Sequence, residues 1–163
     1  AYEEPPYFAA FLAMDARTAA QITPRLPRLT RLWGTSLINP GDPHQGSVAA
    51  LTYDLQNVGF VDAPLVLQNN ASDFRASFGV KMPVRVLDRR LFSMGVDAYR
   101  LAQSWMKWQN EIDIDGTTGR LSFKQSDSAI VQRIAQPAVI KANKIVPTSA
   151  EELQNIKIRS NSP

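Results

Sequence analysis

The sequence contains no cysteine and a single histidine, His44. The lack of cysteine excludes disulfides, thiolate zinc sites and cysteine nucleophiles. Hydrolysis by a catalytic triad needs a nucleophile, a base and an orienting acid, and only Asp42 and Ser47 lie near His44 in the chain. No Gly-x-Ser-x-Gly turn is present either. We therefore predict that the chain has no catalytic residues and is not an enzyme.

Sequence motifs for bound metals and phosphates are also missing. Asp113-Ile-Asp-Gly116 resembles the start of a calcium loop, but the twelfth position, which requires a bidentate glutamate, is Lys124. Gly116-x-x-Gly119 lacks the third glycine and the following helix that would bind a phosphate. The sequence thus predicts no metal site and no cofactor.

Long hydrophobic runs and a strong charge of one sign are absent as well. No stretch of 18 apolar residues and no signal-peptide core occur, so the sequence itself predicts neither a membrane span nor a signal. The net charge is +3, and the one local basic cluster, Arg25, Arg28 and Arg31, is more typical of a solvated loop edge than of a nucleic-acid footprint. With 44% hydrophobic and 20% charged residues, the composition is that of a globular protein with a proper core.

One long amphipathic helix is predicted over residues 88–108. Its apolar residues recur at steps of three and four, the period of one helix face. They are Leu91, Met94, Ala98, Leu101, Trp105 and Trp108, widened by Phe92, Val96, Tyr99, Ala102 and Met106, and the polar side holds Ser93, Asp97, Arg100, Ser104 and Lys107. We expect the apolar side to pack against a sheet and the polar side to face solvent. Gly95 within the helix suggests close packing or a bend.

Several strands are predicted around this helix. Residues 7–13 form a continuous apolar run of the kind buried on both faces of a parallel sheet, and Asp15 is placed to cap a following helix. Further strands are expected at residues 31–35, 58–61, 129–134 and 137–147, and strict alternation marks another at residues 120–124. Asn143 is expected to adopt a positive φ in a hairpin turn.

The order of helix, linker, Asp115-Gly-Thr-Thr-Gly119 and strand resembles the end of type I periplasmic binding folds. Met94-Gly-Val-Asp-Ala98 and its helix are similar to the C-terminal domain of the LpoA (LppC/YraM) family, lipoprotein activators of class A penicillin-binding proteins. The resemblance implies an α/β fold, the C-terminal half of a two-lobed domain with parallel sheets flanked by helices. The implied organisation is a second-lobe portion (residues 1–61), a first-lobe portion (64–125), a return hairpin to the second lobe (129–147) and a flexible tail (148–163).

The resemblance also implies a function. It suggests a non-catalytic regulator of peptidoglycan synthesis that binds and activates a class A penicillin-binding protein, with peptidoglycan or a small cleft ligand as further candidate partners and no nucleic acid. The implied location is the periplasm, with anchoring to the outer membrane through an N-terminal lipid outside this sequence. The missing half of the two-lobed domain is expected to lie upstream.

A solute-binding module for a small amino-acid-like ligand is the alternative, because related folds bind such ligands between their lobes. Four polar residues near predicted strand ends and loops are the candidates for an interlobe cleft. They are Thr35, Ser36, His44 and Asp62.

Overall fold

The computed structural model describes residues 9–27, 30–41, 46–68, 71–107, 110–124 and 130–154. The chain forms two compact units. Unit 1 combines Ala1–Asp62 with Pro137–Pro163, and unit 2 is Ala63–Gln136. His44 and Trp108, which figure in the sequence predictions, lie outside the described residues.

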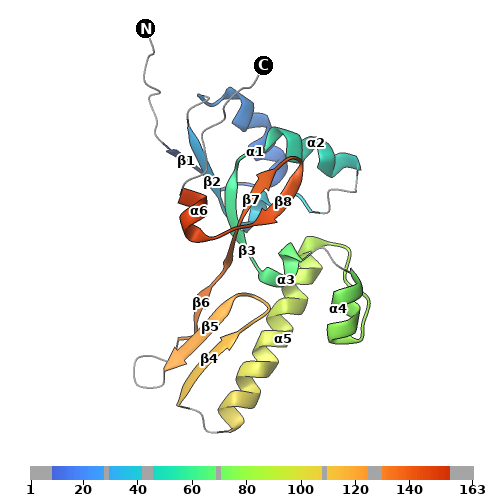
Figure 1. The fold of residues 1–163 in the computed structure, drawn as a ribbon, viewed down its shortest axis with the longest axis vertical. Helices are drawn as coiled ribbons and strands as arrows, with labels where there is room; N and C mark the ends of the chain where they lie inside the picture. The colour runs from blue at the N-terminus through green and yellow to red at the C-terminus, as the bar shows by residue number, and fades with distance from the viewer. Residues whose placement is uncertain are drawn as a thin grey trace. The chain divides into compact units, whose positions relative to one another are not determined.

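Unit 1 is built on a five-stranded sheet in the order β1-β2-β3-β7-β8 (Figure 1). β1 (Ala9–Leu12), β2 (Arg31–Gly34) and β3 (Gly59–Asp62) are parallel, and β7 (Gln136–Lys141) pairs antiparallel with β8 (Lys144–Pro147). Ala142 and Asn143 join the last two strands with φ values of 47° and 58°. This confirms the predicted hairpin and its positive φ at Asn143.

Helices cover one face of this sheet. α1 (Ala16–Ile22) starts where Asp15 accepts a 2.9 Å hydrogen bond from the Thr18 amide, as predicted, and it contacts α2 (Gly46–Asp54). Short 3-10 turns follow α1 (η1, Thr23–Arg25) and β2 (η2, Ser36–Ile38). The covered face carries Leu12, Gly34 and Phe60 at matching register, all of them buried.

The prediction that β1 is buried on both faces is wrong for this chain. Only Leu12 is buried in the strand, and Phe11, which points to the other face, is 65% exposed. Val61 of β3 is 41% exposed as well. The apolar run was read correctly as a strand, but the chain supplies a covering layer for one side of it only.

The polar segment after β8 differs from the predicted flexible tail. It forms the short helix α6 (Ala150–Gln154), and Leu153 is buried. Ser149 and Glu152 make a reciprocal capping box, in which the Glu152 amide donates to Ser149 Oγ at 3.0 Å and the Ser149 amide donates to Glu152 Oε2 at 3.3 Å. One buried leucine and two capping bonds are enough to fix this turn.

Unit 2 consists of helices and a three-stranded antiparallel sheet in the order β4-β5-β6. The helices are α3 (Pro64–Leu67), α4 (Ala71–Phe78) and α5 (Val86–Met106), and the strands are β4 (Glu111–Asp115), β5 (Arg120–Lys124) and β6 (Gln132–Ile134). Strand β5 has the predicted bounds. Strand β4 was missed because its alternating charges, Glu111, Asp113 and Asp115, are not the residues that favour strands.

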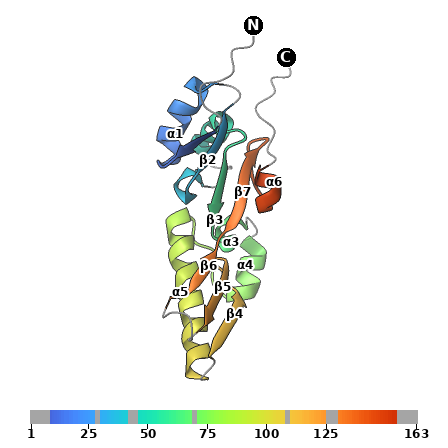
Figure 2. The ribbon, with the colours of Figure 1, turned by 90° about the vertical axis from the view of Figure 1, so that its left-hand side faces the viewer.

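Helix α5 spans the predicted segment but presents the opposite side to its neighbours. Arg89, Ser93 and Asp97 are its buried residues, whereas Leu91, Met94 and other apolar residues of the predicted core side are exposed. Figure 2 shows the three strands and α4 on one side of α5 and no described element on the other. The predicted face assignment is therefore wrong within this chain.

Aromatic rings hold α4 against α5. Phe74 and Phe78 of α4 lie with ring centroids 5.1 Å and 5.2 Å from Phe92, in tilted and edge-on arrangements. Phe74 is 4% exposed, so the cluster buries apolar area in addition to its ring contacts. Phe92 thus belongs to the core of unit 2, as the sequence predicted.

Candidate functional site

The carboxyl ends of β2 and β3 bring polar side chains together at one edge of the unit 1 sheet. Thr35 directly follows β2, and Asp62 is the last residue of β3. Neighbouring parallel strands end at the same edge, which is where α/β folds bind ligands. Three of the four predicted cleft residues, Thr35, Ser36 and Asp62, therefore lie near this edge, while His44 is outside the described residues.

Hydrogen bonds fix these side chains in place. The Thr35 hydroxyl accepts a bond from the Leu37 amide at 3.3 Å and so caps η2. Asn39, just after η2, donates its side-chain amide to Asp62 Oδ2 at 2.8 Å and accepts from the Gly41 amide at 3.0 Å. Asp62 is 3% exposed, so this carboxylate is held inside the unit. Thr35 and Ser36 are half-buried and keep partial access to solvent.

Asn39 is the member of this group that sequence reasoning missed. It precedes Pro40-Gly41, a turn-forming pair, and that position alone did not distinguish a structural asparagine from a loop residue. Gly34 explains how η2 folds so tightly over the strand end, because a Cβ at this position would overlap the Ile38 side chain. The edge offers hydroxyl and amide groups for hydrogen bonding a polar molecule, and among its described residues no base contacts a hydroxyl.

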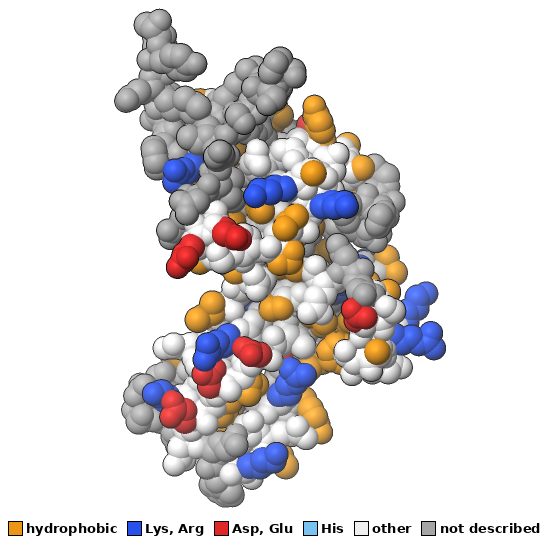
Figure 3. Space-filling view, in the orientation of Figure 1, with side chains coloured by type: hydrophobic (Ala, Val, Ile, Leu, Met, Phe, Trp, Pro, Cys, Tyr) orange, Lys and Arg blue, Asp and Glu red, His pale blue; other side chains and the backbone are white. Residues whose placement is uncertain are grey.

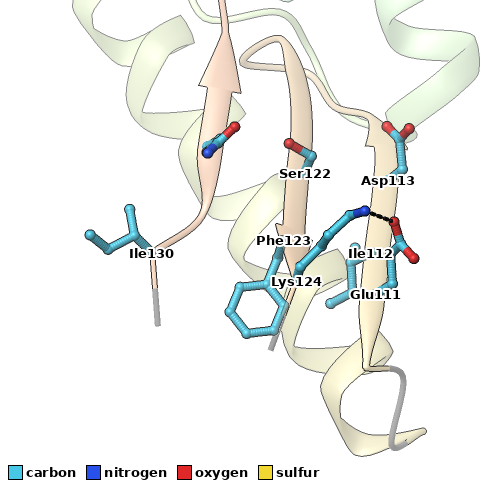
Figure 4. A pocket seen from close by; sticks show the side chains of 8 residues that line it. Glu111, Ile112, Asp113, Ser122, Phe123, Lys124 and Ile130 are labelled. Atoms are coloured by element: carbon cyan, nitrogen blue, oxygen red, sulfur yellow. Dashed lines mark ion pairs between the residues drawn. The ribbon is translucent and has the colours of Figure 1, made fainter. Parts of the chain in front are cut away.

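A second polar region covers one face of the unit 2 sheet. A cavity of about 340 Å³ lies over β4, β5 and β6 (Figure 4). Its charged lining residues pair with one another or with neighbours: Lys124 Nζ lies 3.0 Å from Glu111 Oε1, and Arg120 Nη2 lies 2.7 Å from Asp113 Oδ2. The hydrogen bond from Arg120 lowers the pKa of Asp113 and, reciprocally, raises that of Arg120. All four side chains are about half exposed or more, so these pairs contribute little to stability.

The Asp115-Gly-Thr-Thr-Gly119 turn is fastened to α5 by Asp97. The Thr118 amide and hydroxyl both donate to Asp97 Oδ2 at 2.7 Å, and the Thr117 amide donates to Oδ1 at 2.8 Å. The Thr117 hydroxyl lies 2.9 Å from both Oδ1 and the Ser93 carbonyl oxygen, and its single hydrogen serves one of them. Burial alone would raise the pKa of Asp97, but these hydrogen bonds outweigh burial and lower it.

The two glycines of the turn are required by this geometry. A Cβ on Gly116 would lie 2.6 Å from Asp97 Oδ2, and Gly119 has a φ of 136° that other residues rarely adopt. The motif on which the family resemblance rests is therefore a structural lock between helix and hairpin. Its residues are consumed by internal bonds and do not form a reactive centre.

Two further surveys concern the residues that the structure describes. Within these ranges, His, Asp and Glu nowhere gather in a group of three that could hold a metal ion. In the same ranges no helix has the length and apolar character needed to cross a bilayer.

A comparison with protein families gives one match, the family described as "LppC putative lipoprotein", over residues 8–136. This match covers most of the chain. The chain belongs to the LppC family. No curated protein matches the sequence.

Solved structures show the same fold. The C-domain of LpoA (YraM) from Haemophilus influenzae, described as a regulator of PBP1A, matches with a TM-score of 0.63 and 20% identity over 87% of this chain. Full-length LpoA from the same organism matches with a TM-score of 0.65 and 18% identity over 86% of this chain. The predicted α/β class and the relation to type I periplasmic binding folds are thereby confirmed for this LppC chain.

A solute-binding relative has the higher identity. A Chromobacterium violaceum protein assigned to branched-chain amino acid ABC transport matches with a TM-score of 0.61 and 27% identity over 81% of this chain. This LppC chain spans 45% of the LpoA C-domain, 26% of full-length LpoA and 42% of the C. violaceum protein. It thus corresponds to less than half of the length of each of these structures.

Proposed function

We propose that this chain is part of a periplasmic lipoprotein domain that binds a class A penicillin-binding protein and stimulates its transpeptidase without catalysing a reaction itself. The observation that carries the proposal is the LppC family match over residues 8–136. A solved relative of the same fold, the LpoA C-domain, is described as a regulator of PBP1A. Anchoring to the outer membrane through a lipid on an upstream segment is part of the proposal.

The use of polar side chains within the chain supports a binding role. Thr35 caps a turn, Asn39 bonds to the buried Asp62, and Asp97 holds the hairpin turn. A regulator acts through the shape and chemistry of a protein surface, which such internal bonds keep rigid. The same bonds would hinder a catalytic role, since they occupy the groups that chemistry would need.

The test uses the protein as its own gene encodes it and the soluble ectodomain of a class A synthase. Biolayer interferometry should detect saturable binding, and the synthase should form more peptide cross-links in the presence of the protein. A type I solute-binding protein of the same fold serves as the matched control. Absence of binding, or binding that leaves the cross-linking rate unchanged, would show that the proposed function is wrong.

A solute-binding role is the second candidate, and the 27% identity to the C. violaceum protein favours it. In this case Thr35, Ser36, His44 and Asp62 would contact the ligand. A ligand at a hundred times its Kd stabilises a protein by about 2.7 kcal/mol, which thermal shift readily detects. Amino acids and peptidoglycan fragments should be screened with the wild type and with Ser36→Ala, and a stabilisation that the variant loses would favour this role.

A further inference from the structure

Helix α5 carries an apolar stripe that nothing in its unit covers. The stripe follows alternating steps of four and three residues and is free of charge over its whole length. It consists of Leu87, Leu91, Met94, Ala98, Leu101 and Trp105. Leu87, Leu91, Met94 and Trp105 are 58%, 58%, 59% and 53% exposed, and with a rise of about 1.5 Å per residue the stripe is roughly 27 Å long.

The opposite side of α5 already has its partners. Ser93 and Asp97 bond to the hairpin turn, and they lie roughly 130° around the helix from the centre of the stripe, given about 100° per residue. Figure 3 shows hydrophobic side chains between Lys and Arg side chains in the part of the surface that includes α5. A helix with one satisfied polar side and one exposed apolar side is typical of an element that lies between two layers.

Gly95 gives the stripe a further feature. A Cβ built at this position meets no atom within 4 Å, so nothing within the chain explains a glycine that costs about 1 kcal/mol relative to alanine in a helix. Gly95 borders Ala98 and Ala102 on the helix surface, and the three small residues leave a flat strip beside the larger side chains. Such a strip allows another backbone to approach closely.

Unit 1 has an uncovered apolar face of its own. Phe11 and Trp33 are register partners on the side of the sheet away from Leu12 and Phe60, and Val61 lies on that side too. Phe11 is 65% and Val61 is 41% exposed. Parallel sheets are almost always covered on both faces, and β1 is also an edge strand among the described strands. Each unit therefore lacks one layer.

We propose that both faces are docking surfaces for one further α/β segment of the same protein, which completes the layers of the two units. The coverage of the relatives supports this occupant: more than half of the LpoA C-domain has no counterpart in this chain. The segment would place an apolar sheet face on the α5 stripe and a helix over Phe11, Trp33 and Val61. The proposal is independent of the regulatory function, because any protein with this fold would need the same completion.

Hydroxyl-radical footprinting of the 163-residue chain and of the protein encoded by its gene tests the proposal. Met94, Trp105 and Phe11 should be oxidised rapidly in the chain and at least tenfold more slowly in the gene-encoded protein. Tyr53, which is 70% exposed on α2, should react equally in both. Unchanged reactivity of the three residues would overturn the proposal, and protection that appears only as the concentration of the 163-residue chain rises would assign the surfaces to a second copy instead.

A pair of variants provides a second measurement. Leu91→Asp should leave the melting temperature of the 163-residue chain nearly unchanged, because Leu91 is exposed there. In the gene-encoded protein it should lower the melting temperature by about 5 °C or more, since the carboxylate would be buried without a partner. Gln103→Asp, also at an exposed position of α5 but off the stripe, should be tolerated in both proteins. Equal effects of Leu91→Asp in the two proteins would contradict the proposal.

Discussion

At the scale of single residues, Asp97 carries more tertiary structure than any other described polar side chain discussed above. It is 3% exposed and receives bonds from two consecutive residues of the hairpin turn. A buried carboxylate is stable only when such donors replace water. The side chain therefore acts as a hydrogen-bonded joint between α5 and the β4–β5 hairpin.

Replacement of Asp97 by alanine is expected to destabilise the chain by about 3 kcal/mol, because the amides of Thr117 and Thr118 lose their acceptor inside the protein. Asp88→Ala is the control, since Asp88 pairs with Arg85 at the surface and exposed pairs contribute about 0–1 kcal/mol. Urea denaturation at pH 7 measures both. Similar midpoints for the two variants would refute the structural role of Asp97.

The lowered pKa of Asp97 predicts the direction of a pH effect. A carboxyl whose pKa is lower in the folded than in the unfolded protein stabilises the fold above its unfolded pKa, and that contribution is lost as pH falls through the folded value. We expect the urea midpoint of the wild type to fall below about pH 4, where carboxyl groups begin to protonate. Asp97→Asn should show a smaller fall, and an identical pH profile would assign the effect to other carboxylates.

His44→Ala is expected to leave the activity of the protein intact. A single loop histidine with no base or nucleophile partner predicted beside it has no role in acyl transfer. Binding of the synthase ectodomain and its cross-linking rate are the two readouts. Loss of an intrinsic hydrolytic or transferase activity in this variant, with the circular dichroism spectrum preserved, would refute the non-enzymatic proposal.

At the scale of elements, α5 shows why amphipathic period and facing direction are separate questions. The period correctly predicted the helix and its bounds to within two residues. The side that packs was assigned from hydrophobicity, and within this chain the wrong side was chosen because Asp97 and Ser93 bond to a turn 20 or more residues away. The earlier expectation that Leu101→Asp unfolds the protein applies only when the stripe is covered, because Leu101 is half-buried here.

The docking of α4 is open to a separate test. Phe74→Ala should destabilise the 163-residue chain by about 3 kcal/mol, because it removes a buried ring from the contacts with Phe78 and Phe92. Tyr99→Ala, at a position of α5 that is 64% exposed, is the matched control and should change stability by less than about 0.5 kcal/mol. Hydrogen exchange should show the amides of α4 opening first. Equal stability of the two variants would place α4 away from the core of unit 2.

At the scale of the whole molecule, the uncovered faces of the two units are the dominant feature. An exposed apolar stripe on α5 and an exposed sheet face around Phe11 should bind a hydrophobic dye. We expect the 163-residue chain to enhance the fluorescence of 8-anilinonaphthalene-1-sulfonate strongly, while its thermal unfolding remains cooperative. A monomeric chain that binds no dye would show that its own residues cover both faces.

The sequence by itself determined the element order and the family. Local signals were sufficient for this purpose: the helical period of α5, the alternation of β5, the cap at Asp15 and the positive φ at Asn143 each depend on near neighbours in the chain. The glycine and threonine spacing between β4 and β5 carried the resemblance to the LppC family, and the family match confirms it. The absence of cysteine narrowed the chemistry in the same direct way.

The tertiary structure decided which side of each element is buried. Asp62 and Asp97 are inside because distant residues donate hydrogen bonds to them, and no local pattern encodes donors 20 or more residues away. The same reason explains the missed Asn39, which becomes a site residue only through Asp62. The apolar residues left outside on α5 and β1 follow from layers that one stretch of sequence cannot supply, since burial depends on what packs against a face as well as on the face itself.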